Sequence, residues 1–253
     1  ILGVDKMEKV RVKHLHHSSF LVEIYDAVFI FDFWKGRKSG KQSPEKIFMP
    51  ENFKDKKNIF VFASHHHHDH FDPVIFSWKK ALPQIQYFLS YDIESHCISR
   101  KDIGSNNDNI HFIRPHKEYS FGDLTVRALK STDEGVAFLV DYKGFVLYHA
   151  GDLHWWYWHG EPDDWNKNME LAFKSEVSLL KGYRIDIAFL PADPRQEDAG
   201  LWGMIYFLEN VDVKTAYPMH FWDDTKILHR IKEEAGNHPV LNKVIIPANN
   251  QKN

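Results

Sequence analysis

A run of five histidines and one aspartate begins at His65 and follows the apolar segment Ile59–Ser64 without a break. A short apolar segment rich in β-branched and aromatic residues is typical of a buried strand. A loop that leaves a strand can turn alternate side chains to one side, so His65 and His67 can hold one metal ion. Asp69 and His70 can then reach a second ion. Because imidazole and carboxylate ligands suit zinc, iron or manganese, the sequence predicts a metal site at this strand end.

Histidine is the unusual component of the composition, with 17 residues against 13 glycines. The 32 lysines and arginines and 35 aspartates and glutamates give a net charge of −3, and the scattered cationic residues argue against a nucleic-acid partner. Cys97 is the single cysteine, so neither an intramolecular disulfide nor a cysteine-based zinc site is available. No apolar run approaches the ~20 residues of a membrane-spanning helix. We expect a cytoplasmic protein with a small-molecule substrate and no membrane partner, and a homo-oligomer is compatible with these features.

No proline-rich linker or low-complexity tract divides the chain, so we expect a single domain over residues 1–253. The residues before Met7 are expected to be disordered or a processing remnant. The first half is rich in short β-type segments and contains one helical segment, Pro73–Ala81. The predicted strands are Lys9–His16, Phe20–Phe31, Ile59–Ser64, Ile85–Leu89, Ile110–Arg114, Leu124–Leu129, Val136–Tyr142 and Phe145–His149. Lys143-Gly144 joins the last two segments as a hairpin turn.

The second half alternates between helix and strand. Apolar residues from Trp165 to Leu180 recur every three to five positions, which predicts an amphipathic helix that ends near Lys181-Gly182. The predicted elements that follow are Ile185–Leu190 (strand), Leu201–Leu208 (helix), Thr215–Met219 (strand), Asp224–Ala235 (helix) and Lys243–Ile246 (strand). Two sheets covered by helices would satisfy both halves, which places the chain in the α/β or α+β class.

Two later segments carry further candidate ligands: Tyr148–Asp152, which ends in Gly-Asp, and Pro218–His220. Together with the His-x-His-x-Asp-His run, these segments resemble the metallo-β-lactamase superfamily. The segments His16–Phe20 and Phe31-Asp32 resemble the branch that contains the ascorbate-6-phosphate lactonase and related hydrolases. The resemblance extends from about Val10 to Ile246 and implies an αββα four-layer sandwich.

The resemblance implies two metal sites that share Asp152. One contains Asp69, His70, Asp152 and His220, and the other contains His65, His67 and Asp152. This second set lacks a histidine that most of the superfamily places after the strand equivalent to Leu124–Leu129. Asp133 or Glu134 could take that place, although a carboxylate in a turn can also be solvated or act as a local cap. We expect one ion, or two ions of unequal affinity, with Zn²⁺ as the leading candidate and Mn²⁺ or Fe as alternatives.

Four other residues are candidates for the substrate pocket. Trp155 and Trp222 lie close to the proposed ligands in sequence and could wall the site, or could pack against neighbouring elements instead. Arg195 could hold an anionic substrate group through two hydrogen bonds, or form a surface ion pair. His17 follows an early strand and could line the pocket or be structural. His149, inside an apolar strand, is expected to support the ligands rather than bind metal.

The predicted function is that of a metal-dependent hydrolase in which bound metal lowers the pKa of water to ~7 and delivers hydroxide to a lactone, ester or phosphoester. Asp152 would bridge two ions, and Asp69 would act as a ligand or as the general base. One alternative is a phosphodiesterase that acts on a nucleotide or short nucleic acid. Another is a non-catalytic metal-binding or sensing module with a degenerate first site. The sequence motifs of serine hydrolases, P-loop nucleotidases and Rossmann dehydrogenases are absent.

Overall fold

The computed structural model describes residues 10–36, 48–96 and 108–247. Cys97 and the segment before Met7 lie outside these residues. Within the described part of the chain, no helix is both long and apolar enough to cross a membrane.

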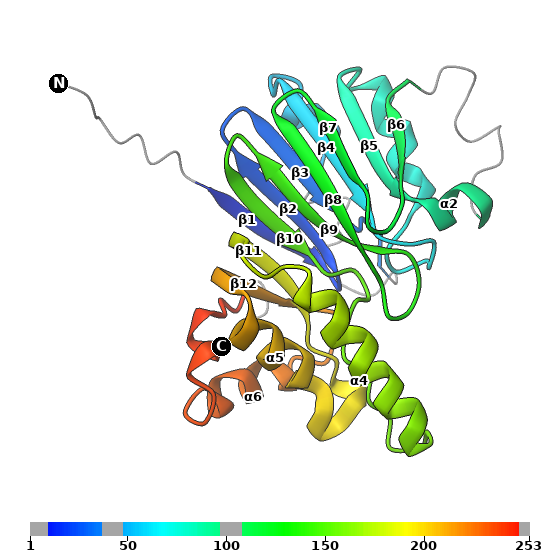
Figure 1. Cartoon of the computed structure of the whole chain (residues 1–253). Helices are drawn as coiled ribbons and strands as arrows, with labels where there is room; N and C mark the ends of the chain where they lie inside the picture. The colour runs from blue at the N-terminus through cyan, green and yellow to red at the C-terminus, as the bar shows by residue number, and fades with distance from the viewer. Residues whose placement is uncertain (1–9, 37–47, 97–107, 248–253) are drawn as a thin grey trace.

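The first sheet is built from the N-terminal half of the chain (Figure 1). Its strands, in spatial order, are β1 (Arg11–His16), β2 (Ser19–Ile24), β3 (Ala27–Phe31), β4 (Asn58–Ala63), β5 (Ile85–Ser90) and β6 (Ile110–Ile113). The first three strands are antiparallel, whereas β3 to β6 are parallel. The predicted run Phe20–Phe31 is therefore two strands, because the chain turns at Tyr25, which has a φ angle of 52°.

The second sheet contains β12 (Asp212–Met219), β11 (Arg184–Pro191), β10 (Phe145–His149), β9 (Val136–Tyr142), β8 (Leu124–Lys130) and β7 (Glu118–Phe121), in that spatial order. Strands β10, β11 and β12 are parallel, and the others are antiparallel. The predicted hairpin between β9 and β10 is present, with positive φ angles at Lys143 (53°) and Gly144 (83°). Strand β7 was not predicted, because its short segment Glu-Tyr-Ser-Phe contains only two apolar residues.

Helices cover the outer faces of both sheets. The α-helices are α2 (Tyr91–His96), α4 (Asp163–Ser178), α5 (Trp202–Asn210) and α6 (Lys226–Glu234). The short 3₁₀ helices are η1 (Pro50–Phe53), η2 (Pro73–Lys80), η3 (Pro194–Leu201) and η4 (Pro239–Lys243). In Figure 1, α5 lies beside β11 and β12, and α4 packs against α5. Helix α6 packs against η3 and η4, whereas α2 lies beside β5 and β6.

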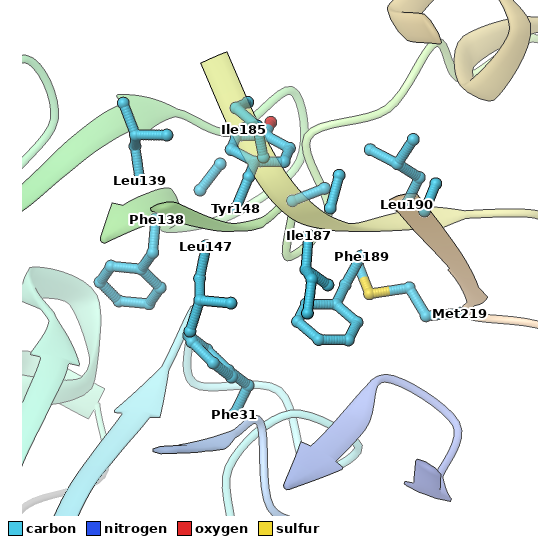
Figure 2. Packing of buried hydrophobic residues seen from close by; sticks show 14 of the residues in the cluster. Phe31, Phe138, Leu139, Leu147, Tyr148, Ile185, Ile187, Phe189, Leu190 and Met219 are labelled. Carbon is cyan, nitrogen blue, oxygen red and sulfur yellow. The ribbon is translucent and has the colours of Figure 1, made fainter. Parts of the chain in front are cut away.

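Successive side chains of a strand point to opposite faces of its sheet, and this alternation explains how the layers pack. In β4, Phe60 and Phe62 belong to the apolar cluster that also contains the second sheet, whereas Ile59 and Val61 belong to a cluster with η2. Figure 2 shows the space between the sheets, where Phe31 of β3 lies beside residues of β10 and β11, and its ring centroid is 5.9 Å from that of Phe189. The predicted αββα sandwich is thus confirmed.

The predictions for two other elements need correction. The segment Lys243–Ile246 is not a strand, because η4 occupies its start and only Val244 forms an isolated bridge with Ala216. The predicted helix Pro73–Ala81 is a 3₁₀ helix, which Asp72 caps by accepting a hydrogen bond from the backbone N–H of Val74 at 2.9 Å.

Candidate metal centre

The predicted ligands follow the ends of strands from both sheets, and these strand ends lie close together. His65 to His70 follow β4, Asp152 follows β10, and His220 follows β12. The fold brings two groups of ligand atoms together, each within 4.8 Å: His65, His67 and Asp152 in one, and His17, Asp69, His70 and His220 in the other. All of these residues are buried except His67, which is half-buried.

Asp152 lies between the two groups. Its Oδ1 is 3.2 Å from Nε2 of His70 and 3.4 Å from Nε2 of His220. Its Oδ2 is 3.6 Å from Nε2 of His65. One carboxylate therefore faces histidines of both groups, which is the position of a bridging ligand.

The buried polar atoms of this cluster fit a cation. Nε2 of His65, Nε2 of His70 and Oδ1 of Asp152 are buried and have no hydrogen-bond partner. Leaving such groups unsatisfied is costly, typically ~1–3 kcal/mol each. Because lone pairs of nitrogen and oxygen converge there, a divalent ion would satisfy them, and this donor set suits zinc, manganese or iron.

Neighbouring side chains orient the histidine rings. Nδ1 of His70 donates to Oδ2 of Asp32 at 2.7 Å, and Nδ1 of His220 donates to Oδ2 of Asp193 at 3.0 Å. Nδ1 of His65 lies 3.0 Å from the hydroxyl of Ser64. Because the Nδ1–H groups of His70 and His220 donate to these carboxylates, the Nε2 atom of each ring keeps its lone pair for a metal ion. This role of Asp32 and Asp193 was not predicted from the sequence, although each residue follows a predicted strand closely.

Burial and nearby charges set the ionisation of the carboxylates. Burial raises the pKa of Asp32 to about 6 and that of Asp152 to about 7. Burial alone would also raise the pKa of Asp69, but the neighbouring His17 and His70 hold it well below its usual range. Asp69 is therefore ionised, whereas Asp152 becomes a stable carboxylate when a cation lies beside it.

The histidine rings of the centre differ in the direction of their pKa shifts. Burial holds the pKa values of His65 and His70 well below the usual value, so both rings are neutral. Burial lowers the pKa of His220, but the carboxylates of Asp152 and Asp193 outweigh this effect and raise it. A neutral imidazole is the form that binds a metal ion.

Asp133 and Glu134, the two candidates for the missing ligand, lie beside different residues. Oδ2 of Asp133 is 3.9 Å from Nδ1 of His67, and Asp133 lines the cavity above the metal residues. Glu134 lies instead with His66 and Asp92, in a separate group of potential ligands. Asp133 therefore lies beside the incomplete group, and Glu134 does not.

A cavity of about 360 Å³ opens beside the candidate metal ligands and is lined by His67, Asp69, Asp152 and His220. Its other lining residues are Thr132, Asp133, Trp156, Trp158, Trp165, Met169, Arg195 and Trp222. Trp155 lies elsewhere, since its ring packs against Trp202 and Tyr206 of α5, at 5.7 and 6.3 Å between centroids. Of the two roles predicted for Trp155, the structure shows packing against a neighbouring element, whereas Trp156 and Trp158 form the wall of the cavity.

Arg195 lies on the rim of this cavity and is half-exposed. Its Nε lies 3.0 Å from each carboxylate oxygen of Asp193. Its guanidinium carbon lies over the rings of Trp158 and Trp222, at 5.6 and 5.5 Å from the centroids. These contacts hold the guanidinium in place and leave donors available for a ligand.

The remaining histidines near the run contact other groups. Nδ1 of His66 lies 2.8 Å from Oδ2 of Asp92, and the side chain of His68 is 74% exposed. Nε2 of His149 donates to the carbonyl of Ser18 at 2.9 Å. His149 thus stabilises the turn that carries His17 and does not join either group of ligands.

Several residues of the centre have a left-handed backbone. The φ angles are 48° at His17, 44° at Asp32, 63° at His220 and 52° at Trp222. Residues with side chains seldom adopt this conformation, and such strain is concentrated at functional sites. Gly135 also has a positive φ, and an added Cβ there would lie 2.0 Å from the carbonyl oxygen of Ser64. The ligand loop therefore packs directly against the backbone of Gly135.

Comparisons with known proteins agree with this fold. A family model described as the beta-lactamase superfamily domain matches residues 11–156. A UPF0173 metal-dependent hydrolase from Pyrococcus abyssi is 27% identical over 221 residues, which cover 84% of each chain. A metallo hydrolase from Ignicoccus hospitalis has a TM-score of 0.63 at 18% identity and covers 94% of both chains. The metallo-beta-lactamase fold protein YhfI from Bacillus subtilis has a TM-score of 0.60 at 13% identity, over 94% of this chain and 96% of that one.

The two solved structures show a shared fold, and the family model covers more than half of the chain. The predicted ligands also converge at strand ends of this fold. The protein belongs to the metallo-β-lactamase superfamily.

Proposed function

We propose that this protein is a metal-dependent hydrolase that acts on a lactone, ester or phosphoester bond of a small polar substrate. The observation that carries the proposal is the position of Asp152 between two groups of ligand atoms from residues that are buried, except for the half-buried His67. The name of the Pyrococcus abyssi relative supports the same type of activity. Zinc is the ion that we propose, since histidine nitrogens predominate among the ligand atoms.

A divalent ion bound there supplies Lewis acidity and brings the pKa of water towards ~7. The protein's residues would position the reactants. Asp69, which is ionised, can bind the ion or orient the attacking water, and Asp152 faces both groups of ligands. The tryptophan wall formed by Trp156 and Trp158 would exclude bulk water from the reacting bond.

The substrate side of the site carries a cation beside aromatic rings. Arg195 lies between Trp158 and Trp222 and can donate to a phosphate or carboxylate of the substrate. The cavity of about 360 Å³ suits a small molecule. We therefore propose a compact substrate with one anionic group near the bond that is hydrolysed.

The test is turnover of ester, lactone, phosphomonoester and phosphodiester panels by zinc-loaded protein and by two variants, Asp152→Asn and His220→Gln. Both variants should lower turnover by on the order of 10³-fold or more, since each removes a group from the reaction centre. His116→Gln is the matched control, because His116 is exposed and pairs with Glu176 at 3.0 Å. Undiminished turnover in Asp152→Asn would overturn the assignment, and zinc binding without turnover of any panel member would favour the non-catalytic module.

A further inference from the structure

His17 lies among the proposed ligands, although it comes from the turn after β1. Its Nε2 is 3.4 Å from Oδ2 of Asp69 and, like Nε2 of His65 and His70, is buried and makes no hydrogen bond in this structure. Its ring centroid is 4.3 Å from that of His220. Its side chain is fully buried. By distance alone, His17 could be a further metal ligand or a hydrogen-bond donor to the ligands.

The hydrogen bond on the other ring nitrogen decides between these roles. The backbone N–H of Trp222 donates to Nδ1 of His17 at 3.2 Å. A backbone N–H can only donate, so Nδ1 must carry the lone pair. In a neutral imidazole the proton is then on Nε2, and a protonated nitrogen has no lone pair for a metal ion.

The other histidines of the same group have the opposite arrangement. Nδ1 of His70 donates to Asp32, and Nδ1 of His220 donates to Asp193, so their Nε2 atoms carry lone pairs. Nε2 of His17 is the nitrogen that points towards Asp69. The group therefore contains two imidazoles arranged as ligands and one arranged as a donor.

The backbone around His17 fixes this orientation. Nε2 of His14 donates to the carbonyl of His17 at 3.0 Å, and the backbone N–H of His220 approaches the same carbonyl at 3.4 Å. The ring of Trp222 lies 4.2 Å from the ring of His17 between centroids. A flip of the imidazole would place Cδ2–H, which cannot accept a hydrogen bond, against the N–H of Trp222. The observed orientation is therefore the one that keeps this hydrogen bond.

We propose that His17 is a positioning residue whose Nε2–H donates to Oδ2 of Asp69 and that it does not bind the metal ion. The inference rests on the proposed metal site. A donor on one oxygen of Asp69 fixes the plane of the carboxylate and directs its remaining lone pairs towards the ion and the attacking water. Asp69, His70, Asp152 and His220 would then hold the ion, and these four residues make a full set of zinc ligands without His17.

Two variants test this role through metal binding. His17→Gln retains an N–H donor of similar reach, whereas His17→Leu removes it, and His220→Gln is the comparison for a true ligand. Zinc titration with a competing chelator should show the wild-type number of ions in both His17 variants. The leucine variant should bind zinc roughly 10–100-fold more weakly, and glutamine should restore most of that loss. A loss of one ion in His17→Gln, as in His220→Gln, would overturn the proposal.

A second measurement uses the unaltered protein and so does not depend on the folding of a variant. ¹⁵N NMR of histidine side chains in the zinc-loaded protein should show a proton on Nε2 of His17 and on Nδ1 of His70 and His220. An unprotonated Nε2 on His17 would overturn the proposal. If the wild-type protein binds no divalent ion, the proposed function fails instead, and the two failures are therefore distinguishable.

Discussion

Asp32 and His70 form a buried pair in which Oδ2 of the carboxylate accepts a hydrogen bond from Nδ1 of the imidazole at 2.7 Å. Both side chains are fully buried. The same carboxylate accepts from the backbone N–H and the hydroxyl of Ser64, each at 2.7 Å. Asp32 therefore joins the end of β3 to the start of the ligand loop after β4, and it determines which nitrogen of His70 faces the metal centre.

The first prediction concerns this pair. Asp32→Asn should weaken zinc binding by roughly 10–100-fold, because the amide cannot accept all of the hydrogen bonds that orient His70 and Ser64. The measurement is zinc affinity by competition with a chelator. Asp212→Asn is the control, since Asp212 is exposed at the opposite end of β12 from His220. Equal affinity in Asp32→Asn and the wild type would show that the pair does not orient the ligand.

The second prediction separates the two carboxylates of the turn before β9. Asp133→Ala should lose one zinc ion per chain, or bind it much more weakly, because Oδ2 of Asp133 lies 3.9 Å from Nδ1 of His67. Glu134→Ala should keep the wild-type ratio, since Glu134 lies with His66 and Asp92. Elemental analysis of protein purified without a chelator gives the ratio. Loss of an ion in Glu134→Ala, with the wild-type ratio in Asp133→Ala, would identify Glu134 as the missing ligand.

The third prediction tests the close approach of β9 to the ligand loop. Gly135→Ala should lower the free energy of unfolding by at least about 3 kcal/mol, because its Cβ would overlap the carbonyl of Ser64. Gly144→Ala has a similar positive φ of 83° but nothing within 4 Å, so it should lose only ~1–2 kcal/mol. Urea unfolding of metal-free protein measures both. Similar losses in the two variants would mean that backbone strain, and not this contact, accounts for the effect.

The fourth prediction concerns acid stability. Burial lowers the pKa of His14 from 6.5 to about 4 in the folded protein. The unfolded chain therefore binds a proton more readily between these values, and the folded state loses stability as the pH falls below 6.5. Between pH 7 and pH 5 this one group should lower the free energy of unfolding by ~2 kcal/mol, at 1.36 kcal/mol per pH unit.

His14→Gln should remove that part of the pH dependence and keep a donor to the carbonyl of His17. Urea unfolding of metal-free protein at pH 7 and pH 5 measures the difference between the variant and the wild type. An unchanged dependence in His14→Gln would show that His14 is protonated in the folded protein at pH 5.

Local patterns were sufficient for the layers of the fold and the main ligand loop. Alternation in Ile59–Ala63 places aromatic residues on one face of β4 and aliphatic residues on the other, and each face is buried in its own cluster. The spacing His-x-His-x-Asp-His after that strand belongs to one loop, so neighbouring residues alone indicate the chemistry. Similarly, the three-to-five-residue spacing of apolar residues was sufficient to predict α4.

Weak local patterns explain the elements that differ. Val244 lies beside β12 through a single bridge to Ala216, and Pro239 begins a 3₁₀ helix just before it. An apolar segment such as Lys243–Ile246 has the composition of a strand, and β12, the edge strand of its sheet, lies beside it. The 3₁₀ helix η4 occupies the start of the segment, so the pairing with β12 is limited to one bridge.

The sequence by itself determined the strand alternation, the four layers and the order of the six predicted ligands along the chain. Only the tertiary structure placed His17 against His220, Asp32 against His70 and Asp133, rather than Glu134, beside His67. The physical reason is distance along the chain: periodicity reports which face a residue occupies within one element, whereas these contacts join strand ends from two sheets. The tautomer of His17 has the same origin, because the N–H that fixes it belongs to Trp222 in the loop after β12.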